Sequence, residues 1–190
     1  MNTRLLGILC IAGNLIAVVV AWVQLASGAD SQPGNDIFGL LWVIGVLAGL
    51  VGLIQGNAVG SNPVVRAVAF LPIIAVVIVI GIGIAVQFGA ATATYESILG
   101  TFGYFGWLAG MVLVSILTIA AKTWLGWRRF APLFVLVMAF FVQTGINTAG
   151  GMTPISLALG YTVGLASWAL LGYVVATAEP APTRAMSATA

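Results

Sequence analysis

Long apolar stretches, separated by short polar segments, set the pattern of this sequence. Six of them run for about 20 mainly apolar residues, the length that a helix needs to cross the hydrocarbon core of a bilayer. The pattern predicts an all-α integral membrane protein, a compact bundle of six transmembrane helices within residues 1–178. Residues 179–190 are rich in Ala, Pro, Thr and Ser and are expected to form a mobile cytoplasmic tail. The predicted spans are residues 5–27, 37–55, 67–88, 98–120, 130–148 and 155–177.

Prolines mark where helices are expected to begin and to bend. Asn62-Pro63 and Thr153-Pro154 each combine a residue that caps helix N-termini with proline at the first helical position. Pro72 falls inside the third predicted span, where its missing N–H is expected to kink the helix.

The charged residues indicate which way the spans run. The basic residues all fall at the ends of the chain or in alternate loops, and Asp30, Asp36 and Glu96 fall in the loops between. Because Lys and Arg are concentrated on the cytoplasmic side of membrane proteins, both termini are predicted to be cytoplasmic. A cleaved signal peptide is the competing interpretation of the first span, but the apolar run is longer than the roughly 7–15 residues of such peptides. The basic residues are Arg4, Arg66, Lys122, Arg128, Arg129 and Arg184.

Composition excludes several classes of protein. Of the 190 residues, 62% are hydrophobic and only 5% are charged, whereas soluble domains are about 25% charged. A net charge of +2 without a basic cluster gives no reason to expect nucleic-acid binding. With no histidine and a single cysteine, Cys10, the chain has no ligand set for haem, zinc or iron–sulfur clusters, so no metal and no cofactor is expected. The lack of targeting features favours a bacterial inner (plasma) membrane.

The predicted spans carry no deeply embedded ionisable residue. Asp, Glu, Lys or Arg inside the membrane usually marks a proton relay, an ion path or a voltage sensor. Ser, Thr and Tyr alone rarely supply both a nucleophile and its base. The protein is therefore expected to be non-catalytic, and neither a proton-coupled pump nor a channel with a charged ring.

Small residues line one face of several predicted spans. Helices in lipid associate through small residues because the lipid supplies no hydrophobic drive between them. We predict that these glycines lie at helix–helix contacts within the bundle. The alternative is that one such face meets another subunit or a flat apolar ligand. The glycines are Gly45, Gly49 and Gly52 in span two, Gly103, Gly106 and Gly110 in span four, and Gly160 and Gly164 in span six.

Neutral polar and aromatic side chains are the candidates for ligand binding. Trp107 and Trp168 lie near the predicted midplane, where an indole N–H needs a partner and a quinone, carotenoid or acyl chain would stack. Gln143 and Asn147 are four residues apart and share a helix face, where they would hold a carbonyl or hydroxyl of a ligand. The full set is Tyr104, Trp107, Gln143, Asn147, Tyr161 and Trp168.

Hydrogen bonding between helices is the other interpretation of the embedded polar groups. It applies to the candidate polar residues and also to Asn14, Ser115 and Thr118. At the predicted inner surface, Trp124 and Trp127 lie beside Arg128 and Arg129. These four are expected to anchor the protein at the membrane interface, with the cations near anionic headgroups.

Two functions follow from these features, and the first is favoured. An accessory or structural subunit of a larger membrane complex would explain the absent catalytic set, the small extramembrane mass and the many small-residue faces. Its partners would be the lipid bilayer and other membrane protein subunits.

The alternative is a carrier or binding component for a small neutral or apolar ligand, such as a lipid, a quinone, a carotenoid or a vitamin-like molecule. Its support is the polar and aromatic patch, the expected kink at Pro72 and a weak internal similarity between residues 66–72 and 129–133. In length and span count alone, the chain is similar to the six-span substrate-capturing subunits of vitamin importers, whose motifs it lacks.

Overall fold

The computed structural model describes residues 2–27, 37–87, 103 and 105–178. This part of the chain consists of helices and connecting turns and contains no strand. The predicted tail at 179–190, Tyr104 and Arg184 lie outside the described residues. In chain order the helical elements are α1 (Thr3–Ser27), α2 (Ile37–Gln55), α3 (Pro63–Val68), α4 (Leu71–Gln87), α6 (Trp107–Ala121), η2 (Gly126–Phe130), α7 (Ala131–Leu136), η3 (Val137–Val142), α8 (Gln143–Ala149) and α9 (Pro154–Thr177).

In the part of the chain that the structure describes, four helical stretches are long and apolar enough to cross a membrane. They are Thr3–Ser27, Pro63–Gly81, Gly126–Ala149 and Pro154–Thr177. Within the described residues, two further apolar helices, Leu41–Gln55 and Trp107–Ala121, are shorter. The chain thus has the make-up of a multi-pass, all-helical membrane protein, and the count of six spans stays a prediction.

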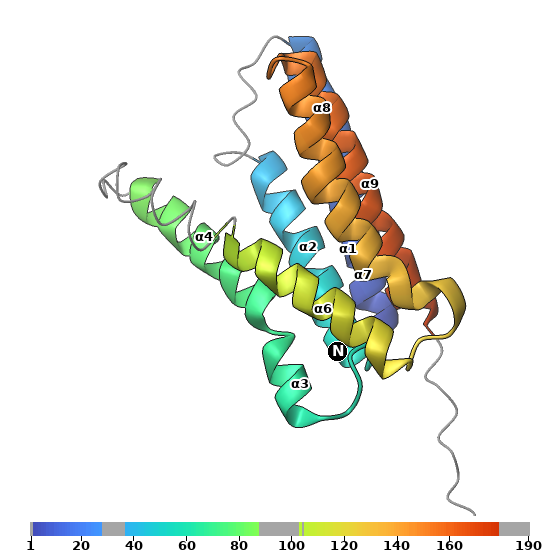
Figure 1. The fold of residues 1–190 in the computed structure, drawn as a ribbon. Coiled ribbons are helices and arrows are strands. Elements are labelled where there is room, and N and C mark those ends of the chain that lie inside the picture. Colours follow the sequence, from blue (N-terminus) through green and yellow to red (C-terminus); the bar gives the residue numbers. More distant parts are fainter. Residues whose placement is uncertain (1, 28–36, 88–102, 104, 179–190) are drawn as a thin grey trace, which may run out of the picture.

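The helices form two groups. α1 packs along α9 and α2, and α9 also packs against the continuous run from α7 through η3 to α8. We refer to these helices as the bundle. α4 pairs with α6, which contacts α7, and this pair is the arm. Figure 1 shows α4 and α6 side by side, leaning away from the bundle toward the end opposite the N-terminus.

Both predicted proline starts are confirmed. The Asn62 side-chain oxygen accepts from the backbone N–H of Val64 at 2.9 Å, and the Thr153 hydroxyl accepts from the N–H of Ser156 at 3.3 Å. Each side chain therefore satisfies an N–H group that the first helical turn leaves without a partner.

Pro72 breaks its helix. The regular pattern stops at Ala69 and Phe70, a turn that separates α3 from α4, and Pro72 is the second residue of α4. The break is expected because proline has no N–H for the carbonyl four residues earlier. Figure 1 shows α3 set at a marked angle to α4.

The segments that carry the described basic residues lie at one end of the molecule, which we term the basic end. In Figure 1 the N-terminus, α3, the α6–η2 link and the end of α9 all lie there. The indole N–H of Trp124 donates to the Gly56 carbonyl at 3.2 Å, and the Arg128 guanidinium donates to the Thr177 carbonyl at 2.9 Å. These bonds tie the α6–η2 region to the ends of α2 and α9.

Helical structure begins before the predicted start of the fifth span at residue 130. A 3-10 helix over Gly126–Phe130 precedes α7. Arg128 and Arg129 thus lie in the first helical turn rather than in a loop. The positive φ of Gly126, +62°, is a backbone conformation that glycine adopts at little cost, and it lets the chain turn into the helix at this position.

Glycines bring α1, α2 and α9 into close contact. A methyl group added at Gly13 would lie 2.9 Å from the Leu41 carbonyl oxygen on α2. One added at Gly49 would lie 2.8 Å from the Cys10 sulfur on α1, and one at Gly52 would meet Val175 on α9 at 2.5 Å. Since real Cβ atoms do not approach other atoms this closely, larger residues here would push the helices apart.

The expectation of hydrogen bonds between helices is wrong for several embedded polar groups. The hydroxyls of Ser115 and Thr118 donate to carbonyls four residues earlier in α6, at 2.7 and 2.8 Å. The Asn14 amide nitrogen donates to the Cys10 carbonyl of its own helix at 2.7 Å. Short polar side chains reach the preceding turn of their own helix more easily than a neighbouring helix.

Candidate functional site

A pocket of about 450 Å³ lies between the arm and the bundle. From the arm, α4 contributes Val76, Val79 and Ile80, the first residue of α6 is Trp107, and Gly103 precedes it in the chain. The α4 residues are three and four positions apart, so they share one helix face. That face is the one turned toward the bundle.

The bundle side of the pocket comes from three regions. α2 supplies Trp42 and Val43. The helical run through η3 and α8 supplies Ala139, Phe140, Gln143 and Thr144, and α9 supplies Tyr161, Gly164, Leu165 and Trp168. The α9 residues follow the spacing i, i+3, i+4 and i+7 of a single helix face. The pocket is therefore built from regular helix faces rather than from loops.

Aromatic rings form a connected wall. The rings of Trp107 and Phe140 are stacked, with centroids 5.8 Å apart and planes 21° apart. Trp107 also meets Trp168 at 6.4 Å with a tilt of 45°. These separations fall in the range of favourable aromatic pairs. A residue from the arm and two from the bundle thus give the pocket a broad aromatic surface.

The amides of Gln143 and Asn147 pack into the small-residue face of α9. The Gln143 amide oxygen lies against Gly164, and the Asn147 amide oxygen lies against Gly160, in each case where a larger residue would carry its Cβ. A glycine Cα–H points at each oxygen instead, which is the geometry of a weak C–H···O contact. Two sets of candidate residues, the polar pair of span five and the glycines of span six, therefore meet in two neighbouring contacts.

Both walls contain π-helical backbone. η3, a π-helix over Val137–Val142, carries Ala139 and Phe140 into the pocket. On the arm, Gly103, Phe105 and Gly106 are also π-helical, just before Trp107. π-helical turns are rare and occur frequently at functional sites. Their presence on both sides of one pocket marks this region as unusual within the described chain.

None of the described residues that line the pocket carries a formal charge. Its polar groups are neutral: the Gln143 amide, the Thr144 and Tyr161 hydroxyls, and the tryptophan indoles. A charged ligand would lose its hydration here without a counter-charge, whereas a neutral ligand would not. The chemistry available is therefore stacking, apolar contact and a few hydrogen bonds.

Four of the six candidate ligand-binding residues line this pocket. They are Trp107, Gln143, Tyr161 and Trp168. Asn147 is not among the lining residues; it is 9% exposed, and its amide oxygen has no hydrogen-bond partner in the described part of the chain. Tyr104 lies outside the described residues.

The glycines proposed for helix packing have more than one role. A methyl group added at Gly110 would lie 2.7 Å from the Pro72 nitrogen, and one at Gly106 would lie 3.6 Å from the Ala75 Cβ. Gly45 lies against the Asn14 side chain, with 2.5 Å between the added carbon and the amide nitrogen. Gly103, by contrast, lines the pocket.

Sequence reasoning missed several lining residues. Phe140 lies three positions before Gln143, and this spacing places it on the face of the polar pair. The arm residues Val76, Val79 and Ile80 give no such indication, because every position nearby is equally apolar. Only the tertiary arrangement of α4 against the bundle distinguishes their face.

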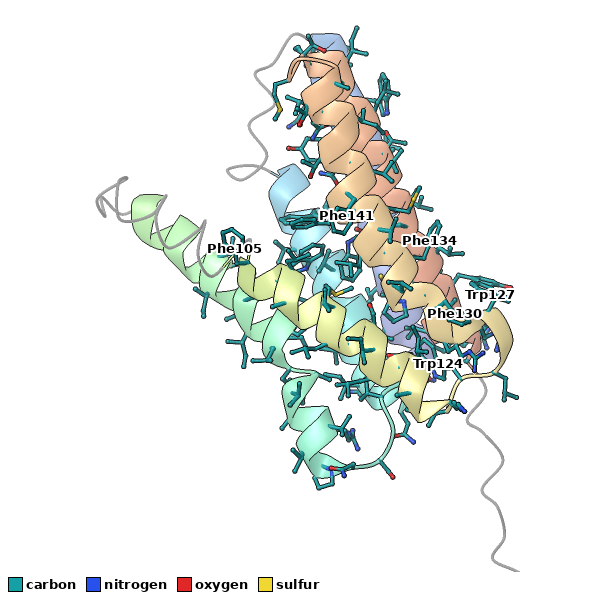
Figure 2. All side chains as sticks on the ribbon, viewed as in Figure 1. Phe105, Trp124, Trp127, Phe130, Phe134 and Phe141 are labelled. Carbon is teal, nitrogen blue, oxygen red and sulfur yellow. The ribbon has the colours of Figure 1, made fainter. Side chains whose placement is uncertain are left out.

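At the basic end, the four expected anchors separate into two kinds. Figure 2 shows Trp124 and Trp127 near the junction of α6 and η2. Trp124 is only 3% exposed and donates to Gly56, so it packs inside the protein instead of facing lipid. Trp127 is 53% exposed, as expected of an interfacial residue. The Arg129 guanidinium lies over the Phe130 ring at 4.9 Å.

Neither protein-family models, nor curated proteins, nor solved structures match this chain.

Proposed function

We propose that this chain is a non-catalytic membrane protein that binds a small, uncharged, largely apolar ligand in the pocket between arm and bundle. The observation that carries the proposal is the make-up of that pocket, an aromatic and aliphatic wall with a few neutral polar groups and, among its described residues, no charged one. Ligand sites are typically concave, mostly apolar and about 300–1,000 Å³ in volume, and this pocket has about 450 Å³. The π-helical turns on both walls add support.

Ligand binding has better support than the accessory-subunit function favoured by the sequence. That function rested partly on an excess of small-residue helix faces. Gly49 and Gly52 contact α1 and α9, Gly110 contacts α4, and Gly164 contacts the Gln143 side chain. Because these faces are occupied within the chain, they give no reason to invoke helices of another subunit.

We further infer that all six apolar segments cross a bacterial inner membrane, with both termini cytoplasmic. In support, Arg4, Arg66, Lys122 and Arg128 belong to the segments that meet at the basic end. The positive-inside rule places such an end in the cytoplasm.

Native mass spectrometry of protein released gently from its own membrane tests the ligand-binding proposal. Val79 lines the pocket, whereas Val77 of the same helix is 52% exposed, so Val79→Trp and Val77→Trp form a matched pair. The indole introduced by Val79→Trp would fill the pocket, and the one introduced by Val77→Trp would not. We expect a reproducible small bound mass on the native protein and on Val77→Trp, and its loss from Val79→Trp.

Two results would contradict the proposal. The first is a native protein without any small bound mass, and the second is a bound mass that Val79→Trp leaves unchanged. A discrete heteromeric mass without a small ligand would instead favour the accessory subunit.

A further inference from the structure

Hydrogen-bond donors without an acceptor surround the pocket. Trp42, Trp107 and Trp168 all line it, and the described residues supply no acceptor for their indole N–H groups. Two tryptophans elsewhere differ: Trp22 donates to the Thr162 hydroxyl at 2.9 Å, and Trp124 donates to the Gly56 carbonyl at 3.2 Å. None of the three indole nitrogens is among the buried atoms without a partner, so these N–H groups are open to an acceptor that enters the pocket, and a hydrogen bond to one of them would stabilise that acceptor.

The Gln143 amide adds a further donor. Its oxygen lies against Gly164 of α9. Because the amide group is planar and trigonal, its nitrogen is then directed away from Gly164. Among the described residues there is no acceptor for this nitrogen either. Gln143 therefore presents N–H groups, rather than its oxygen, to a ligand.

The shape of the wall restricts the ligand as well. Trp107 and Phe140 stack with nearly parallel planes, and Trp168 completes a tilted aromatic surface. Aromatic faces of this kind pack best against another flat ring. Trp168 is only 2% exposed, so this surface is fixed by its surroundings.

We propose that the pocket selects a flat, conjugated, uncharged ligand that carries a carbonyl oxygen, such as an aromatic ketone or a quinone. The ring lies on the surface formed by Trp107, Phe140 and Trp168, and the carbonyl accepts from Gln143 and from an indole N–H of the pocket. This inference rests on the proposed function, since it specifies the chemistry of the ligand at the same site.

Two matched probes test the inference. Fluorenone is a flat tricyclic ketone, and fluorene has the same rings without the carbonyl. Equilibrium dialysis of nanodiscs that contain the protein, corrected with protein-free nanodiscs, measures the bound amount of each probe. We expect the protein to bind fluorenone about five- to tenfold more tightly than fluorene, which is the ratio that one net hydrogen bond provides.

Variants locate the donor. Gln143→Met keeps the length of the side chain without N–H groups, and Gln55→Met makes the same change at an exposed position at the end of α2. The preference for fluorenone should fall to about twofold or less in Gln143→Met and persist in Gln55→Met.

The outcomes separate the two proposals. Equal binding of both probes, or a preference that Gln143→Met leaves intact, overturns the carbonyl inference and leaves ligand binding standing. If neither probe binds above the protein-free control and the native protein carries no small bound mass, both proposals fail. A bound native mass without a conjugated carbonyl overturns the inference alone.

Discussion

Gly7 of α1 and Gly172 of α9 meet backbone to backbone. A methyl group added at Gly172 would lie 2.7 Å from the carbonyl oxygen of Gly7. Both glycines are buried, and nearby the Cys10 thiol donates to the Trp168 carbonyl at 3.2 Å. This contact holds α1 against α9, the helix that carries Trp168 into the pocket.

The first prediction concerns this contact. Gly172→Ala should lower the free energy of unfolding by about 1–3 kcal/mol, because the added methyl group forces α1 and α9 apart. Reversible unfolding in detergent, followed by circular dichroism, measures the change. Gly81→Ala is the control, since an added methyl group there meets nothing within 4 Å. We expect the control to be neutral or to stabilise by up to about 1 kcal/mol, because alanine favours helix over glycine. Equal destabilisation by both changes would contradict the packing account.

The contact within the arm gives a second prediction. Gly110→Ala places a methyl group 2.7 Å from the Pro72 nitrogen, so α4 must move away from α6. Because both helices line the pocket, this variant should bind fluorenone at least about threefold more weakly. In Gly106→Ala the nearest atom is the Ala75 Cβ at 3.6 Å, an ordinary contact, and binding should stay within about twofold. Equal binding by the two variants would show that arm position does not shape the pocket.

The third prediction separates the tryptophans at the basic end. Trp124→Phe removes a buried indole that donates to Gly56, and it should cost about 1–3 kcal/mol of unfolding free energy. Trp127→Phe changes a side chain that is 53% exposed, and it should stay within about 0.5 kcal/mol. The same unfolding assay measures both. A larger loss of unfolding free energy for Trp127→Phe than for Trp124→Phe would contradict this distinction between the two tryptophans.

Membrane topology gives the fourth prediction. Leu125 lies at the basic end and is 71% exposed, and Ala149 is exposed at the end of α8. Each is replaced by cysteine, in the variants Leu125→Cys and Ala149→Cys. The native Cys10 is fully buried and should give little background. We expect a membrane-impermeant maleimide to label Ala149→Cys in intact cells and Leu125→Cys only in opened cells. Labelling of both from the same side would contradict the six-span arrangement.

Local features of the fold follow directly from the sequence. The helix starts at Pro63 and Pro154 depend on a capping side chain and a neighbouring proline, which are visible within a few residues. α2 begins and ends at the residues predicted for the second span. Neutral polar and aromatic side chains at membrane depth mark Trp107, Gln143, Tyr161 and Trp168 in the sequence, and these four residues share a pocket.

Features that depend on tertiary packing could not be predicted in this way. The burial of Trp124 results from the approach of the α2–α3 link, which no local pattern encodes. The π-helical turn over Val137–Val142 inserts backbone where the sequence is uniformly apolar. Val79 and Val77 are identical residues on one helix, and only the position of the bundle decides which of them lines the pocket.

Photolabelling tests the central claim, that the pocket between arm and bundle binds a neutral ligand, most directly. Benzophenone is an uncharged aromatic ketone that inserts into nearby C–H bonds on illumination, and peptide mass spectrometry locates the adducts. We expect adducts on pocket residues of both helix groups, such as Val79 and Leu165, and their suppression by excess fluorenone. Adducts confined to outward-facing residues such as Val19 and Val23, each 61% exposed, and insensitive to fluorenone would contradict the account.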